Sequence, residues 1–325
     1  MLLLPLCFIV STASCAKLDS AIMVPEEVSP DTTAVVFVIE PDLKPGTEKI
    51  TPDPMVTADE YAPLGFKHQS AAVHGDYAFF VRDGRGAICL YDMANKKKVY
   101  TITIKSEGGK TYHCNQSSFG VEKYDPSDLF PPLYISQRAR SERRCFTEVF
   151  RIIPLFNADS TVLLAFRTEK IQEILFPPMS RENSMGNVNC VIDSKTGWMY
   201  TYSRNNDSSD ENYRVCKISR FAIPSIHQPE VVLEDSDIRS SFFLDVEATN
   251  MQGGCIVGDH LYIGQGYPAV GYIYLNVVDL SEKKLVKRYD LIANGVDWEP
   301  EGCFYYDGNV MLSYMDGISR IIEEE

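Results

Sequence analysis

Five polar residues at equivalent positions along the chain are the first candidates for chemistry. Each opens a short apolar run, and the five are Gln69, Gln116, Asn187, Gln252 and Glu301. Amide and carboxylate oxygens can hold a polar ligand, or a hard cation such as calcium, although one carboxylate supplies little charge for calcium. The alternative is that these groups bond to neighbouring backbone, since buried polar groups must be paired. A polar ligand floor and a structural ring both remain open.

Arginines form the second candidate group, and they fall where the second strand of a unit would turn into the third. A guanidinium fork suits carboxylate and phosphate oxygens. The segments contain Arg82 and Arg85, then Arg138, Arg140, Arg143 and Arg144, then Arg204, with Arg181 shortly before Asn187. The matching later segments carry Asp245, Glu247, Asp297, Glu299 and Asp316, with Tyr267 and Trp298 as stacking surfaces. We expect one face to be cationic on one half and anionic on the other, unless the loop charges pair with each other.

A carboxylate pair near Glu301 is the one candidate for catalysis. If the segment is extended, Glu299 and Glu301 share a face about 6 to 7 Å apart and could bracket a water molecule. Asp297 could take the place of Glu299, and Pro300 could instead make Glu299 a turn acceptor. The chain has no H-E-x-x-H, no G-x-S-x-G and no Gly-rich phosphate loop, and its five histidines lack metal spacing. We therefore expect no metal centre built on histidine or cysteine.

A repeat indicates how these residues are positioned. The segments Gln69 to Asp76 and Gln252 to Asp259 align without gaps, and weaker copies begin at Gln116, Asn187 and Glu301. Strand-like runs follow each copy, separated by Asp-Gly and Gly-Asp turns typical of hairpins. One such meander cannot bury both faces, whereas five arranged radially can. The sequence predicts an all-β, five-bladed β-propeller.

We expect a strand near the N-terminus to close the ring by completing the last unit. The last unit lacks a fourth strand, and the run Thr33 to Ile39 can supply it. In the third unit, we expect Val231 to Leu233 to be the fourth strand. A six-bladed ring and a pair of β-sandwiches are the alternatives.

Composition and the N-terminal segment limit which partners and which cellular location can be expected for the protein. The chain has 325 residues with 31 Lys plus Arg against 45 Asp plus Glu, a net charge of −14, which argues against nucleic-acid binding. Residues 1–10 are apolar and too few to span a bilayer. Small residues then precede Cys15, which resembles a bacterial lipoprotein signal, with cleavage after Ala16 as the alternative. We expect a signal peptide over 1–15, a linker over 16–32, a propeller over 33–325, lipidation at Cys15, and a monomer that meets the membrane through its anchor alone.

Seven cysteines lie beyond the leader, and no C-x-x-C occurs among them. Most stand inside apolar runs, where a free cysteine behaves as a small hydrophobic residue. We expect mainly reduced, buried thiols, with at most one or two bridges.

Three short motifs carry a resemblance to a known group. Gln252-Gly-Gly-Cys-Ile256, Tyr262-Ile-Gly-Gln-Gly266 and Trp298-Glu-Pro-Glu-Gly302 resemble segments of five-bladed propellers of the teichoic-acid-biosynthesis type, of helveticin-like bacteriocins and of phage receptor-binding proteins. The resemblance implies a cell-envelope or carbohydrate-polymer context and transfers no catalytic residue. Five-bladed glycosidases resemble one another in placing carboxylates on their first three blades. Here those positions are the amides Gln69, Gln116 and Asn187, which cannot act as acid or base.

Together these observations predict an exported, lipid-anchored, non-catalytic propeller. Its channel face would bind an anionic glycan, an envelope polymer or a protein partner. The alternative is a hydrolase or lyase acting on an acidic or phosphorylated glycan through the carboxylates around Glu301.

Overall fold

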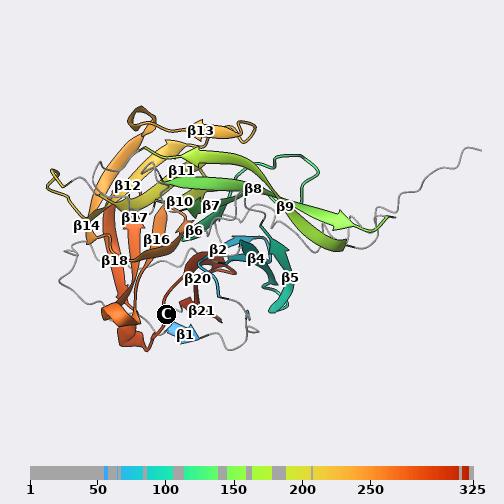
Figure 1. The fold of residues 1–325 in the computed structure, drawn as a ribbon. Coiled ribbons are helices and arrows are strands. Elements are labelled where there is room, and N and C mark those ends of the chain that lie inside the picture. The colour runs from blue at the N-terminus through green and yellow to red at the C-terminus, as the bar shows by residue number, and fades with distance from the viewer. Residues whose placement is uncertain are drawn as a thin grey trace, which may run out of the picture.

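The computed structural model describes residues 55–57, 64, 67–82, 86–104, 113–137, 145–158, 163–177, 188–205, 208–314 and 317–321. The predicted leader, linker and Thr33–Ile39 strand lie outside these residues. Within them the chain forms five sheets, drawn in chain order from blue to red in Figure 1. Their only helices are three 3-10 segments, η1 (Asp235–Asp237), η2 (Pro268–Val270) and η3 (Ile292–Asn294), and no helix among the described residues is long and apolar enough to cross a membrane.

The first three blades are antiparallel four-stranded meanders, and blade 2 has a fifth strand that pairs in parallel. Blade 1 contains β2 (Ser70–His74), β3 (Tyr77–Val81), β4 (Ala87–Asp92) and β5 (Lys97–Thr103). Blade 2 contains β6 (Gln116–Phe119), β7 (Leu133–Gln137), β8 (Phe146–Phe156), β9 (Leu163–Leu175) and, parallel to β9, β13 (Glu230–Val232). Blade 3 contains β10 (Asn189–Asp193), β11 (Trp198–Arg204), β12 (Val215–Ala222) and β14 (Ser240–Glu247).

The last two blades bring the chain back to its beginning. Blade 4 contains β15 (Met251–Val257), β16 (His260–Tyr267), β17 (Tyr272–Asp279) and β18 (Lys284–Asp290). Blade 5 contains β19 (Gly302–Tyr306), β20 (Asn309–Tyr314), β21 (Gly317–Ile321) and β1 (Met55–Thr57). Because β1 pairs with β21, segments near both ends of the described chain share one sheet.

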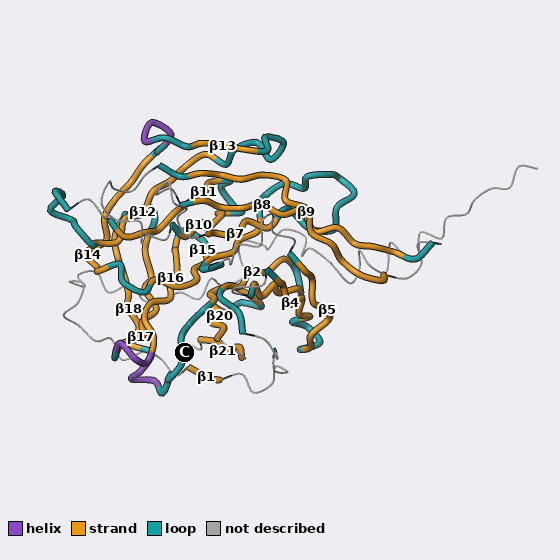
Figure 2. The backbone as a smooth tube through the Cα atoms, viewed as in Figure 1, coloured by secondary structure: helices purple, strands orange, loops and turns teal. Residues whose placement is uncertain are grey.

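The first strands of the blades form a closed ring. Strand β2 contacts β6, β6 contacts β10, β10 contacts β15, β15 contacts β19, and β19 returns to β2. The strands of each blade then follow outward from this ring, as the tube in Figure 2 traces. This confirms the five-bladed β-propeller, and both the six-bladed ring and the sandwich pair are wrong.

The apolar core is divided among the five interfaces between blades. Five buried clusters occur among the described residues, and each joins two neighbouring blades. The cluster between blades 5 and 1 packs Phe304 and Met311 against Phe80 and Tyr91. Since every blade buries both faces in this way, closing the circle removes the last exposed apolar face.

Two details of the sequence prediction need correction. The strand that completes blade 5 is Met55–Thr57, where Thr33–Ile39 was expected. The fourth strand of blade 3 is β14 rather than Val231–Leu233, whose residues lead into β13 of blade 2. Strand β14 is the fourth strand of blade 3 because its alternate residues Leu244 and Val246 pack into the apolar cluster shared with blade 4. The residues of β13, by contrast, are mostly exposed.

Candidate functional site

The central channel has two ends of different character. The amide end carries Gln69, Gln116, Gln252 and Glu301, each at or just before the start of a first strand. At the hairpin end the same strands turn into the second strands of their blades. A five-residue strand separates the two ends by roughly 16 Å. Of the predicted ring, Asn187 lies outside the described residues, and its neighbour Asn189 is buried at the start of β10.

Gln116 closes the channel at the amide end. Its Nε2 donates to the carbonyl of Gly254 at 2.9 Å, and its Oε1 accepts from the amide of Gly254 at 2.6 Å. Blades 2 and 4 are not neighbours, so this pair of bonds spans the axis. Tyr202 of blade 3 donates to the carbonyl of Gln252 at 2.5 Å and lies 3.2 Å from Gln116 Oε1. Burial raises the pKa of Tyr202 well above its usual value, so its hydroxyl stays protonated.

The carboxylates of Glu299 and Glu301 are each held by an amide of another blade. Gln69 Nε2 donates to Glu301 Oε1 at 2.9 Å, and Gln252 Nε2 donates to Glu299 Oε1. The backbone amide of Glu301 donates to the carbonyl of Glu299 at 3.0 Å, which makes Pro300 the centre of a tight turn. The segment is therefore not extended, and the spacing argument for a catalytic pair does not apply. Burial raises the pKa of Glu299.

These contacts also bear on calcium at the amide end. Gln69 and Gln252 present amide N–H groups to the carboxylates, whereas calcium needs oxygen ligands. Among the residues that the structure describes, no three His, Cys, Asp or Glu side chains gather as a metal site would require.

Two arginines of the predicted cationic face can be placed. Arg82 follows β3 and Arg204 ends β11, so both stand at the amide end and are partly buried. The guanidinium of Arg204 lies 5.9 Å from the ring centre of Tyr213. Its Nε is buried, with no hydrogen-bond partner in the part of the chain that the structure describes. The others, Arg85, Arg138, Arg140, Arg143, Arg144 and Arg181, lie outside the described residues, as does Asp316.

Trp298 and Asp297 stand on blade 5 at the same end. The ring of Trp298 stacks on Tyr314 with centroids 4.0 Å apart and packs against the cluster between blades 4 and 5. Asp297 is exposed. Trp298 is thus half-buried and partly committed to packing.

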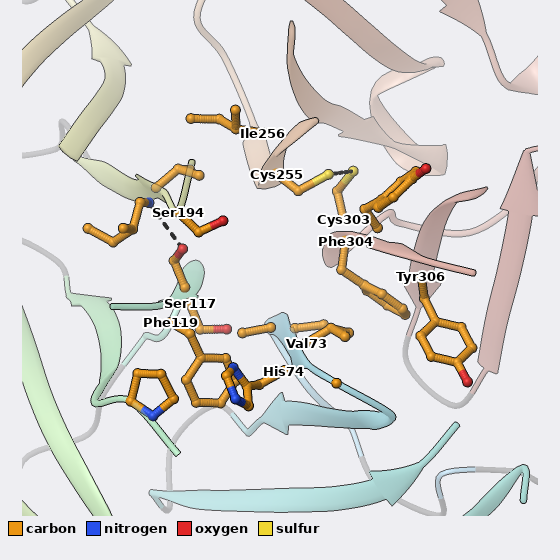
Figure 3. A pocket seen from close by; sticks show the side chains of 18 of the residues that line it. Val73, His74, Ser117, Phe119, Ser194, Cys255, Ile256, Cys303, Phe304 and Tyr306 are labelled. Atoms are coloured by element: carbon orange, nitrogen blue, oxygen red, sulfur yellow. Dashed lines mark hydrogen bonds between the residues drawn. The ribbon is translucent and has the colours of Figure 1, made fainter. Parts of the chain in front are cut away.

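A cavity of about 790 Å³ opens at the hairpin end. All five first strands contribute to its wall, and Gly254, to which Gln116 bonds, is also among the lining residues. Figure 3 shows Val73, His74, Ser117, Phe119, Cys255, Ile256, Cys303, Phe304 and Tyr306 around it. The volume and the mainly apolar, aromatic wall fit a small-molecule or chain-end pocket. The cavity lies on the hairpin side of the layer that Gln116 and Gly254 close, and its described lining includes none of Gln69, Gln116, Gln252 and Glu301.

Two lining residues of the cavity carry a buried polar atom that has no hydrogen-bond partner among the described residues. Ser117 is 2% exposed, and its Oγ is unpaired, as is Nε2 of His74. The His74 ring packs against Phe119 and Phe130 with centroids 5.4 and 5.9 Å away. Both atoms are shielded from solvent, so they face the packed wall rather than the cavity, and leaving such groups unpaired is costly to the fold.

The described lining of the cavity contains acidic side chains and no basic Lys or Arg side chain. Its ionisable lining groups include the carboxylates of Asp76 and Asp307. Asp76 accepts a hydrogen bond from Tyr306 at 3.1 Å. Burial, and then the positive charge of Lys123, lowers the pKa of His74 to about 4. His74 is therefore uncharged at neutral pH.

This buried neutral imidazole predicts an acid sensitivity. The unfolded chain takes up a proton on His74 near pH 6.5, whereas the folded chain does so near pH 4. Stability from this group is therefore complete above pH 6.5 and is lost as the pH falls toward 4, by at most about 3 kcal/mol. We expect urea unfolding of the wild type to weaken more between pH 7 and 4 than that of His74→Phe, which keeps the aromatic contacts. Parallel pH profiles for the two proteins would contradict this.

Sequence reasoning missed the cavity residues and Tyr202. The repeat marks where each first strand begins, and the predicted site residues lie at those beginnings and in the loops at the same end of the channel. Continuing along the same strands leads to His74, Ser117 and Cys255, which lie five, one and three residues beyond Gln69, Gln116 and Gln252. No sequence signal marked Tyr202, because its hydroxyl crosses to two other blades.

Comparisons with known proteins add little to the geometry. No family model matches the chain, and no curated protein matches it. Three similar solved structures are a glutaminyl cyclase of Myxococcus xanthus, a glucose dehydrogenase, and the Cps50 (Swd1) β-propeller domain of Myceliophteria thermophila. The cyclase is 9% identical with a TM-score of 0.42, covering 85% of this chain and 97% of its own. The dehydrogenase is 14% identical with a TM-score of 0.44, covering 83% and 99%. The Cps50 domain is 9% identical with a TM-score of 0.38, covering 78% and 82%. Similarity this low transfers no activity.

Proposed function

We propose that this chain is a non-catalytic binding propeller whose ligand enters the cavity at the hairpin end of the channel. The observation that carries the proposal is the cavity of about 790 Å³, to whose largely apolar wall all five first strands contribute, with serines and the carboxylates of Asp76 and Asp307 among its lining groups. Binding sites of this kind combine an apolar wall with a few polar groups that fix orientation.

The chemistry of the wall favours an uncharged glycan segment. Aromatic side chains can cover the C–H faces of a sugar ring, while serine hydroxyls and the carboxylates of Asp76 and Asp307 can bond to its hydroxyls. An anionic polymer would meet two carboxylates and no described cation there. Such a polymer would instead need Arg82 and Arg204 at the amide end.

The cellular setting is proposed from the leader alone. We propose export, lipidation at Cys15 and a place in the cell envelope, where a glycan polymer or a protein partner would be in reach. The contacts of Glu299 and Glu301 support a structural role for them, because each carboxylate fastens one blade to another.

Two variants at opposite ends of the channel test the proposal. Ser194 is exposed at the cavity mouth, so Ser194→Trp should obstruct the mouth at little cost to the fold. The matched control is the double variant Arg82→Ala with Arg204→Ala. Binding of neutral and anionic oligosaccharides would be followed by titration calorimetry, with released sugar measured in parallel.

We expect Ser194→Trp to weaken binding of a neutral oligosaccharide at least about 10-fold, a loss of about 1.4 kcal/mol, and the arginine variant to leave it unchanged. The opposite pattern, with anionic sugars bound and lost in the arginine variant, would place the site at the amide end. Release of shortened sugars that stops in Glu301→Gln would show the hydrolase or lyase instead.

A further inference from the structure

A pair of cysteines in the cavity wall is independent of the proposed ligand. Cys255 of β15 and Cys303 of β19 face each other across the interface of blades 4 and 5, with 3.4 Å between their Sγ atoms (Figure 3). Both line the cavity. Cys303 is 1% exposed, whereas Cys255 is the one described cysteine that is not buried.

The other thiols differ in accessibility. Burial raises the pKa of Cys89 to about 11 and that of Cys190 and Cys216 to about 12. These thiols are inert toward a reagent, since the thiolate is the reactive form and the reagent must reach it. Burial also raises the pKa of Cys303 well above its usual value, but Cys303 needs no contact with the reagent, because the Cys255 sulfur lies 3.4 Å away. A disulfide reagent that enters the cavity would therefore meet Cys255 first.

We propose that Cys255 and Cys303 are a thiol–disulfide exchange site that a small organic disulfide oxidises to a crosslink between blades 4 and 5. The thiolate of Cys255 attacks one sulfur of the reagent, the reagent's S–S bond breaks, and one thiol leaves with the proton that Cys255 released. Cys303 then loses its proton and attacks the Cys255 sulfur, expelling the second thiol. Two protein thiols are oxidised, and the disulfide reagent is reduced to two thiols.

The two sulfur atoms already lie close to bonding distance. A disulfide is about 2.05 Å long, so the two sulfurs need to approach by about 1.4 Å. A Cβ atom placed on Gly253 would lie 3.1 Å from the backbone nitrogen of Cys303, which shows how tightly β15 and β19 pack here. The two cysteines are 48 residues apart in the chain. A crosslink would therefore close a long loop and restrict the unfolded chain.

Glutathione disulfide is the probe for the test. The native protein is incubated with it, quenched with acid, denatured and alkylated, and its mass and peptides are compared with those of a reduced sample. We expect two fewer alkylated cysteines, a linked peptide pair containing Cys255 and Cys303, reversal by dithiothreitol, and a higher urea midpoint for the oxidised protein.

Variants separate the two steps. Cys255→Ser should abolish the reaction, and Cys303→Ala should stop it at a glutathione adduct on Cys255. Cys89→Ala, in the cluster between blades 5 and 1, should react as the wild type does. The proposal is overturned if the native wild type, which needs no substitution, keeps all its thiols or links other cysteines, or if Cys303→Ala gains no adduct. None of these readouts depends on a glycan.

Discussion

Gly302→Val is expected to lower the free energy of unfolding by about 3 kcal/mol or more, a loss typical of severe overpacking. A Cβ atom at Gly302 would lie 2.8 Å from the Cβ of Ala71, 2.9 Å from the backbone nitrogen of Ala71, and against Ser313 Oγ. Backbone cannot withdraw from such a contact as a flexible side chain can. Blades 5 and 1 would be forced apart where the ring closes, and urea denaturation measures the result.

Gly308→Ala is the matched control. Gly308 has a φ of +76°, and a Cβ atom there would meet nothing within 4 Å. Its substitution should cost only the backbone strain of a left-handed residue, about 1 to 2 kcal/mol. If Gly302→Val is no more destabilised than Gly308→Ala, the close approach of the blades at Gly302 does not limit stability.

Gln116→Ala is expected to destabilise the protein by about 3 kcal/mol. The amide and carbonyl of Gly254 would both lose their Gln116 partner, and Tyr202 would lose one of its two contacts. Leaving a buried polar group unpaired costs about 1 to 3 kcal/mol, and these groups belong to one network. Urea unfolding at neutral pH gives the change.

Two further variants test the physical reason for this prediction. Gln116→Glu keeps an acceptor for the amide of Gly254 but removes the donor and buries a charge, so it should be at least as destabilised as Gln116→Ala. Gln228→Ala removes an exposed amide and should stay within about 0.5 kcal/mol of wild type. An effect of Gln116→Ala as small as that of Gln228→Ala would mean that the bonds across the axis contribute nothing measurable.

The sequence predicted the blades because each contains local signals. Alternating apolar strands and Gly-Asp or Asp-Gly turns depend only on residues that are neighbours in the chain. The repeats beginning at Gln69 and Gln252 can therefore be recognised from the sequence alone. The assignment of Val231–Leu233 failed because that segment is the more uniformly apolar, whereas β14 mixes Phe242, Leu244 and Val246 with Ser, Asp and Glu, and its place is decided by packing against blade 4.

The candidate site was predicted less completely than the fold. The opening amides do gather at one end, and Gln69 meets Glu301 as the repeat implied. The role of these amides could not be predicted from the sequence. The residue type is the same whether a glutamine binds a ligand or, like Gln116, bonds to the backbone of Gly254 across the axis. The ligand-binding role of Arg82, Arg204 and Trp298 stays a prediction.

By itself, the sequence determined an all-β chain of repeated meanders with polar residues opening each unit, since strand alternation and turn chemistry act over a few residues. Tertiary structure decided which end of the channel is closed and which is hollow. That outcome depends on contacts between residues far apart in the chain, such as Gln116 with Gly254, 138 residues away, and Cys255 with Cys303. Side chains meet there only after five blades have closed into a ring.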